Sequence, residues 1–408
     1  MTSTRRERIA IPTIAAILYF SQGFPYGLVN ETVNLYLAAM HIPLSTIGMA
    51  GGVGIVWTLK VFWAPLVDAI GSYRAWIFTT LATVTVTVLV LASVPPASPA
   101  FWVALTLLAI ASATQDIAID ALTIRITPRD LLGLVNSARV TTYRVAMIAA
   151  GGGIAILADR VGWRGAFVVA ALVPLVVIVT IGLVIPRESG DGTRQENPLR
   201  SLLTWIARPG AITLLAVILL YRLGDSALRP MIKPYWIERG FTATEVGNVT
   251  TTLGMICTIL GAIAGGAFTS RFGIYAGLLW LGLAQMLSNL AYAMVASTGA
   301  GRVGLYGAAV TEAFCEGLGI AAFLSFLMFI CDRENAATEY AMLSAVFALS
   351  RTLAGVVSGF FAENMGFAPY FWTTAALALP GLMLLPFIRR TLAEREREGL
   401  APVPLSDL

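Results

Sequence analysis

The chain has 408 residues, of which 57% are hydrophobic and only 12% are charged. A soluble domain carries about 25% charged residues, so the composition excludes water-soluble classes and indicates a polytopic membrane protein. The formal net charge is only +4, and arginines in short loops suit membrane topology better than nucleic-acid binding. The single histidine and three cysteines show no catalytic or metal-binding spacing. We therefore expect no enzyme activity, no metal and no cofactor.

Apolar runs long enough to cross a bilayer follow one another along the whole chain. A hydrocarbon core about 30 Å thick needs roughly 20 apolar residues per helix, and this length predicts about twelve transmembrane helices. The predicted spans are 9–29, 46–67, 74–94, 101–126, 134–158, 164–186, 211–229, 247–268, 274–296, 304–331, 339–361 and 369–388. The sequence thus predicts an all-α membrane protein.

A polar segment in the middle divides these spans into two sets of six. We expect an N-terminal six-helix half at 1–186, a cytoplasmic linker at 187–209, a C-terminal six-helix half at 210–390 and a cytoplasmic tail at 391–408. The stretch from Tyr36 to Gly48 also aligns with the stretch from Tyr235 to Gly247, and Arg144 aligns with Arg351. A 6+6 repeat is typical of secondary transporters whose site lies between the halves. Chance similarity between apolar sequences is the alternative.

The distribution of basic residues predicts the orientation. Most lysines and arginines outside the spans fall in segments on the same side as the N-terminus. The positive-inside rule then places both termini in the cytoplasm. Arg160 and Arg164 run against this rule.

Two acids on the fourth span form the first candidate site. Asp116 and Asp120 are four residues apart, which puts both carboxylates on one helical face. Neighbouring acids disfavour each other's ionisation, which suits proton carriage. The structural alternative is ion pairing with Arg125, Arg139 or Arg144 that holds helices together. Asp120 and Arg125 are also candidates for a cytoplasmic gate.

Lys60 lies within the second span, where an unpaired charge is costly. It either extends its long stem to the cytoplasmic interface or pairs with a carboxylate or an anionic substrate. The sequence leaves both alternatives open.

Further polar residues mark the other spans expected to line a pathway. Arg222 and Asp225 lie on the seventh span, with Gln22 and Tyr26 as polar counterparts on the first. Glu312 and Glu316 form an i,i+4 pair on the tenth span, and Arg351 on the eleventh is their expected neutralising partner. Each residue alone has a structural explanation, whereas together they predict a polar pathway. No nucleotide-binding motif is present, so the energy for transport is expected from a gradient.

Five segments carry a resemblance to a known family. They are LKVFWAPLVD at 59–68, SATQDIAIDA at 112–121, YR at 143–144, YRLGD at 221–225, and LSA with SR within 343–351. Through them the chain resembles the AmpG-like muropeptide permeases of the major facilitator superfamily along most of its length. It departs from the superfamily pattern after Asp68, where the usual basic run is missing, and near Ser270, where an acid is missing.

The resemblance implies the major facilitator fold and proton-coupled import of anhydro-muropeptides across the bacterial inner membrane. A siderophore or acetyl-CoA-like permease is the alternative, and a sensor or membrane enzyme on a transporter scaffold is a remote one. We expect a monomer that binds protons and an anionic sugar-peptide. The candidates for proton coupling or gating are Asp116, Asp120, Arg125, Glu312 and Glu316. The candidates for substrate binding are Gln22, Tyr26, Lys60, Gln115, Tyr143, Arg144, Arg222, Asp225 and Arg351.

Overall fold

The computed structural model describes residues 5–42, 53–184, 205–208, 210–332 and 335–397, and these residues form helices joined by turns. Ten helices within these ranges are long and apolar enough to cross a membrane. One of them, Arg129–Gly182, has 54 residues and bends at Gly162, where φ is 74°, so it is long enough for two crossings. The predicted all-α class is confirmed.

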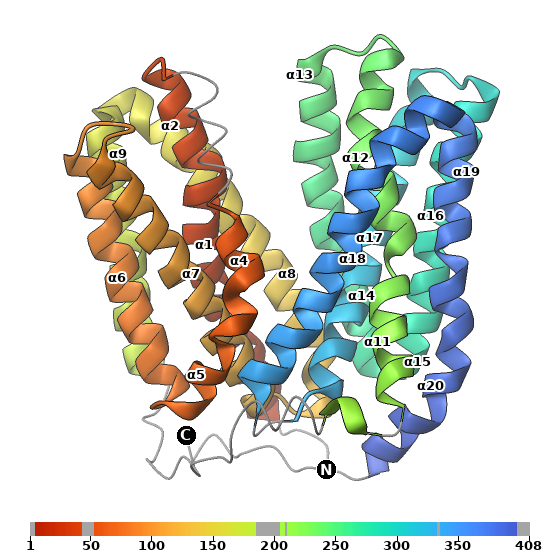
Figure 1. Ribbon diagram of the computed structural model, residues 1–408, viewed down its shortest axis with the longest axis horizontal. Helices are drawn as coiled ribbons and strands as arrows, with labels where there is room; N and C mark the ends of the chain where they lie inside the picture. Colours follow the sequence, from red (N-terminus) through yellow and green to blue (C-terminus); the bar gives the residue numbers. More distant parts are fainter. Residues whose placement is uncertain (1–4, 43–52, 185–204, 209, 333–334, 398–408) are drawn as a thin grey trace.

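The first half of the chain forms the group of helices on the left of Figure 1. Their bounds are α1 Arg5–Gly27, η1 Leu28–Thr32, α2 Val33–Ala39, α4 Ile55–Leu59, η2 Lys60–Phe62, α5 Ala64–Ala69, α6 Tyr73–Ser93, α7 Pro99–Ile126, η3 Arg129–Leu131, α8 Leu132–Ile148, η4 Ala149–Gly153 and α9 Ile154–Val184. The start of the predicted span 46–67 lies outside the described residues.

The second half forms the group on the right of Figure 1. Its elements are α11 Ala211–Leu220, α12 Leu223–Glu238, α13 Ala243–Val246, η5 Gly247–Leu253, α14 Gly254–Phe272, α15 Ile274–Ala276, η6 Gly277–Leu281, α16 Gly282–Thr298, α17 Arg302–Ile330, α18 Ala336–Met365, α19 Phe367–Leu377 and α20 Leu379–Arg397. Between residues 185 and 210, the structure describes only residues 205–208 and 210.

Local sequence signals explain several helix boundaries. Ser72 and Ser98 cap α6 and α7, and their side chains accept hydrogen bonds from the backbone N–H groups of Ala75 and Phe101. Wider π turns interrupt α1 and α8, where η1 and η4 pack together. There the hydroxyl of Thr32 donates a hydrogen bond of 2.6 Å to the carbonyl oxygen of Ala150. This bond helps to satisfy a backbone carbonyl group whose helical hydrogen bond the π turn disturbs.

The seventh predicted span ends too early. The apolar run stops near residue 229, but α12 continues to Glu238 through Pro230 and Pro234. Proline is tolerated inside a membrane helix because neighbouring groups satisfy the freed backbone. Consequently Arg229 and Lys233, which the span boundaries place at the helix end and in the following loop, lie within a helix.

The two halves meet at one end of the molecule and separate at the other (Figure 1). At the first end one apolar cluster includes residues of both halves, such as Leu18 and Ile117 with Phe326 and Leu385. At the other end each half has its own cluster, around Phe101 in the first half and Trp236 in the second. The core is therefore continuous at one end only.

Polar contacts reinforce the continuous end. A carboxylate oxygen of Asp68, in α5, accepts hydrogen bonds from the backbone N–H of Thr338 at 2.7 Å and from its hydroxyl group. The N–H of Ala337 donates to the other oxygen at 3.2 Å. Arg129 donates to the carbonyl oxygen of Arg395 near the end of α20. The helix N-terminus of α18 is thus capped by an acid of the opposite half.

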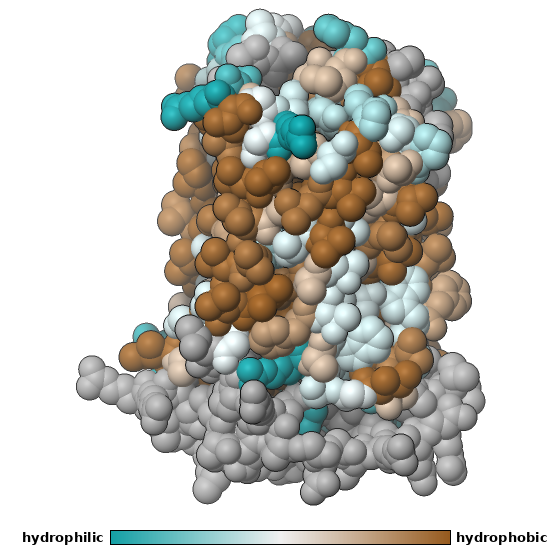
Figure 2. All heavy atoms as spheres, turned by 90° about the vertical axis from the view of Figure 1, so that its left-hand side faces the viewer, coloured by the Kyte–Doolittle hydropathy of each residue, from teal (hydrophilic) through white to brown (hydrophobic). Residues whose placement is uncertain are grey.

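The outer surface is apolar over most of its height. Figure 2 shows the face formed by the first half, with a broad band of hydrophobic side chains below a more polar rim. Exposed members of this surface include Val86 and Leu89 on α6 and Leu172 and Val176 on α9. Exposed apolar side chains of this extent match the hydrocarbon core of a bilayer.

Candidate functional site

Arg144 on α8 lines two cavities, of which cavity A lies between the halves and cavity B lies mainly within the second half. Cavity A has a volume of about 360 Å³ and is lined by α1, η2, α7 and α8 of the first half and by α17 and α18 of the second. Cavity B has a volume of about 240 Å³ and is lined mainly by α12, α14, α16 and α17 of the second half. Several predicted site residues of both halves are thereby brought to one region, among them Lys60, Asp116 and Glu316.

Lys60 and Asp116 form an ion pair in the wall of cavity A. The Nζ atom of Lys60 lies 3.6 Å from Oδ2 of Asp116, and their side chains are 14% and 7% exposed. The other oxygen, Oδ1, is buried and has no hydrogen-bond partner among the described residues. The side chain of Lys60 therefore points toward an acid on α7 and does not extend along its own helix to the interface between membrane and water.

Asp120 has different partners, although it lies only one helical turn from Asp116. Its Oδ1 atom is 3.0 Å from Nη1 of Arg139 and accepts a hydrogen bond of 3.0 Å from the hydroxyl of Tyr19. Arg139 also donates to the hydroxyl of Tyr340, in the opposite half, at 2.7 Å. This network closes the floor of cavity A.

Arg125, on the same helix as Asp120, lies against an aromatic ring. Its guanidinium group lies over the ring of Tyr73, 5.4 Å from the centroid. Five residues along a helix amount to a rotation of about 140° from the starting face, so Arg125 and Asp120 lie on different faces of α7. Asp120 pairs with Arg139, and a role of Asp120 and Arg125 in a cytoplasmic gate stays a prediction.

Aromatic and amide groups form the rest of the wall that α1 and α8 contribute to cavity A. The ring centroid of Tyr26 lies 5.0 Å from that of Trp57 and 5.8 Å from that of Tyr143. Gln22 is buried and lines the same cavity. Gln115 lies behind this wall, where its amide donates to Ser21 at 3.1 Å.

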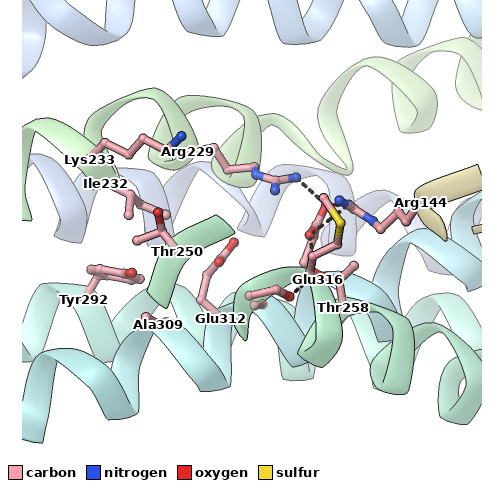
Figure 3. Close-up of a pocket in the computed structure, with 13 residues that line it drawn as sticks. Arg144, Arg229, Ile232, Lys233, Thr250, Thr258, Tyr292, Ala309, Glu312 and Glu316 are labelled. Atoms are coloured by element: carbon pink, nitrogen blue, oxygen red, sulfur yellow. Dashed lines mark hydrogen bonds and ion pairs between the residues drawn. The ribbon is translucent and has the colours of Figure 1, made fainter. Parts of the chain in front are cut away.

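Glu316 joins the halves beside cavity B. It accepts hydrogen bonds from Arg144 of the first half at 3.2 Å, from Thr258 at 3.0 Å and from Arg229. Figure 3 shows Arg144 and Arg229 approaching Glu316 from opposite sides. Arg144 and Arg229 therefore neutralise this acid. Arg351, the partner expected from the sequence, lines cavity A instead.

Arg222 and Asp225 lie apart from both cavities. They pair at 3.3 Å, and Asp225 also accepts a hydrogen bond of 3.1 Å from Asn289. Both residues are 4% exposed, and they line a separate space of only about 10 Å³. Of the predicted substrate-binding residues, the structure does not bring these two to the region between the halves.

Sequence reasoning missed Arg229 and Lys233 on α12 and the tyrosines Tyr19 and Tyr340. The predicted span boundaries place the two basic residues at the end of the seventh span and in the loop after it. Their i,i+4 spacing is the signal that indicates a shared helical face. The tyrosines carry no sequence signal of their own, since tyrosine is ordinary in membrane helices.

Comparison with known proteins agrees with this arrangement. The family model described as "Major Facilitator Superfamily" matches residues 15–217 and again 214–407. The anhydromuropeptide permease of Escherichia coli K12 is 33% identical over 391 residues, which cover 93% of this chain and 80% of the relative. The chain belongs to the Major Facilitator Superfamily. Within it, the chain belongs to the AmpG permease family.

A second sequence relative agrees with this family, and two solved structures share the fold. A Rickettsia conorii transporter designated AmpG 4 is 27% identical, with coverage of 91% of this chain and 95% of the relative. The fucose:proton symporter FucP of E. coli has a TM-score of 0.72 at 16% identity, covering 94% of this chain and 99% of that structure. The proton:xylose symporter XylE has a TM-score of 0.71 at 11% identity, covering 96% and 97%. The protein is thus a multi-pass membrane transporter of a small molecule, with the predicted major facilitator fold.

Proposed function

We propose that this chain imports anhydro-muropeptides, in which a GlcNAc-anhydroMurNAc disaccharide carries a peptide, across the bacterial inner membrane. The observation that carries the proposal is a pair of cavities that share Arg144, one between the halves and one within the second half, while Asp68 and α18 hold the halves together at one end. The substrate class follows from the relative named anhydromuropeptide permease, which is 33% identical. We further propose that the protein acts as a monomer with both termini in the cytoplasm. In that orientation the end at which the halves separate faces the periplasm.

Cavity A suits the sugar part of such a substrate. Tyr26 and Tyr143 line this cavity as an aromatic wall, and Trp57 packs edge-on against Tyr26. Aromatic rings offer an apolar surface to the face of a sugar ring. Buried side-chain oxygens without a partner among the described residues, including that of Gln22, can accept hydrogen bonds from hydroxyl groups. A few convergent polar groups on an apolar wall are typical of small-molecule sites.

Proton coupling is proposed at Asp116. Its carboxylate lines cavity A, where one oxygen has no hydrogen-bond partner among the described residues while the other pairs with Lys60. When a proton binds, the attraction between Asp116 and Lys60 is lost, and Lys60 becomes available to an anionic group of the substrate. Proton binding and substrate binding would then favour each other, as a symporter requires.

The two ends of the molecule differ in the contacts that join the halves, and alternating access requires these contacts to change. The described structure closes the end where Asp68 caps α18 and where Asp120, Arg139 and Tyr340 join the halves. Opening that end requires these contacts to break while the other end closes. Each contact is local and polar, so the two arrangements can lie within a few kcal/mol of each other.

Uptake by purified protein in liposomes tests the proposal. Radiolabelled anhydro-muropeptide should accumulate when the outer medium is acidic, and a protonophore should abolish the accumulation. Excess siderophore or acetyl-CoA should not compete. If folded protein takes up no muropeptide under a gradient, the proposed substrate is wrong and the siderophore alternative takes its place.

A further inference from the structure

Cavity B is lined by more charged side chains than those that form ion pairs with Glu316. Three cations and two acids line it, namely Arg144, Arg229, Lys233, Glu312 and Glu316. Arg144 and Arg229 both pair with Glu316, and Thr258 donates to it as well. One acid and one cation, Glu312 and Lys233, are left without an ion pair within the described ranges.

Glu312 is a buried carboxylate that faces the cavity. It is 5% exposed, and its Oε1 atom has no hydrogen-bond partner among the described residues. Figure 3 shows its side chain extending from α17 into the cavity, toward the side occupied by Arg229. A buried charge of this kind is costly unless a partner compensates it, and the cavity provides the space for one.

Lys233 supplies the opposite charge on the facing wall. It lies four residues after Arg229 on α12 and is exposed to the cavity. In Figure 3 the side chains of Lys233 and Arg229 lie together on the wall opposite Glu312. The cavity therefore places an uncommitted anion and an uncommitted cation across from each other.

We propose that cavity B is a subsite for a zwitterionic amino-acid end of the substrate, whose ammonium group binds Glu312 and whose carboxylate binds Lys233. This inference rests on the proposed function: a peptide linked to the sugar through its α-amino group supplies such an end where a diamino-acid side chain carries both an ammonium group and a carboxylate. A simple anion would leave Glu312 buried without a partner, and a simple cation would leave Lys233 unused beside an added positive charge. A ligand with both charges matches both walls at once.

The subsite divides the substrate between the two cavities. Arg144 lines both, so a molecule bound to the aromatic wall of cavity A continues past Arg144 into cavity B. The sugar would then occupy cavity A and the peptide cavity B. Substitutions in cavity B should therefore affect the transport of substrates that carry a peptide and should leave the transport of peptide-free substrates nearly unchanged.

The experiment compares uptake of two labelled substrates by full-length protein in liposomes. One is the anhydro-disaccharide with its peptide, and the other is the same disaccharide without the peptide. Glu312→Gln and Lys233→Gln should each raise the KM for the peptide-bearing substrate at least about tenfold, the effect of one lost charge pair. The KM for the peptide-free disaccharide should change less than about twofold in comparison. Glu238→Gln, which removes an exposed charge at the end of the same helix α12, is the matched control.

A binding measurement keeps the proposal testable where a variant transports poorly. The free peptide alone should raise the melting temperature of the detergent-solubilised wild type and of Glu238→Gln, but not that of Glu312→Gln. Equal losses on both substrates would overturn the subsite while leaving the muropeptide assignment intact. Failure of the wild type to transport either substrate would instead overturn the proposed function, and the subsite with it.

Discussion

At the scale of single residues, each i,i+4 pair of acids has two unlike members. Asp120 and Glu316 are held by arginines and other donors. Asp116 and Glu312, in contrast, each keep one buried oxygen without a partner among the described residues, and each lines a cavity. The first kind of acid joins helices through its ion pairs, whereas the second kind presents an oxygen at a cavity wall, where we propose that a proton or a ligand binds.

This distinction predicts opposite results for two conservative substitutions on α7. Asp116→Asn should reduce proton-driven uptake to background with a smaller loss of stability than Asp120→Asn, because the contact it removes is longer, 3.6 Å to Lys60 against 3.0 Å between Asp120 and Arg139. Asp120→Asn should instead destabilise the protein by about 3 kcal/mol, since it leaves Arg139 without its buried partner. Uptake in liposomes and thermal melting in detergent measure the two effects. Glu394→Gln, at an exposed pair on α20, is the control, and normal proton-driven uptake by Asp116→Asn would contradict the coupling assignment.

At the scale of elements, the close crossing of α8 and α14 seals the continuous end. A Cβ atom on Gly133 would lie 2.1 Å from the carbonyl oxygen of Gly266, and one on Gly266 would lie 2.3 Å from that of Gly133. Only glycine allows backbones of opposite halves to approach this closely. The hydroxyl of Ser270 then accepts a hydrogen bond from the N–H of Leu134 at 2.9 Å.

A larger side chain at this crossing should therefore oppose the closed arrangement of that end. Gly266→Val should push α8 and α14 apart at a cost of about 1–3 kcal/mol, which shifts a two-state equilibrium by roughly 5- to 150-fold. Transport should slow because the protein is held with this end open. Gly307→Val is the matched control, since nothing lies within 4 Å of a Cβ atom there. Equal uptake rates for the two variants would show that the crossing does not limit transport.

At the scale of the whole molecule, Asp68 connects α5 of one half to the N-terminus of α18 of the other. Its charge and the helix dipole attract each other, and the bonds exist only when this end is closed. The contact therefore biases the balance between the two access states without belonging to either cavity.

Asp68→Asn should shift that balance toward the state in which the opposite end is closed. Hydrogen bonds to a charged group contribute about 1.5–3 kcal/mol, so a shift of about tenfold or more is expected. A cysteine replacing Thr250, which lines cavity B, reports the state through its labelling by an impermeant maleimide, because Cys257, Cys315 and Cys331 are buried. Labelling from outside should slow in Asp68→Asn but not in the exposed control Asp159→Asn. An unchanged labelling rate would exclude Asp68 as a determinant of the balance.

The sequence alone was sufficient for the class, the family and most of the charged residues that matter. Apolar length marks a membrane span because lipid requires a continuous helix, and the cost of a buried charge singles out residues such as Lys60 and Asp116. Helical spacing also predicted that Asp116 and Asp120 share a face. These inferences depend only on local geometry and on transfer from water to lipid.

Only the tertiary structure decided which charges meet. Lys60 lies next to Asp116, Arg139 next to Asp120, and Arg144 of one half next to Glu316 of the other, 172 residues away. The same fold moved Arg222 and Asp225 away from the cavities and brought in Arg229 and Lys233. Spacing along one helix fixes the direction of a side chain, but the partner it reaches depends on the packing of helices from distant parts of the chain.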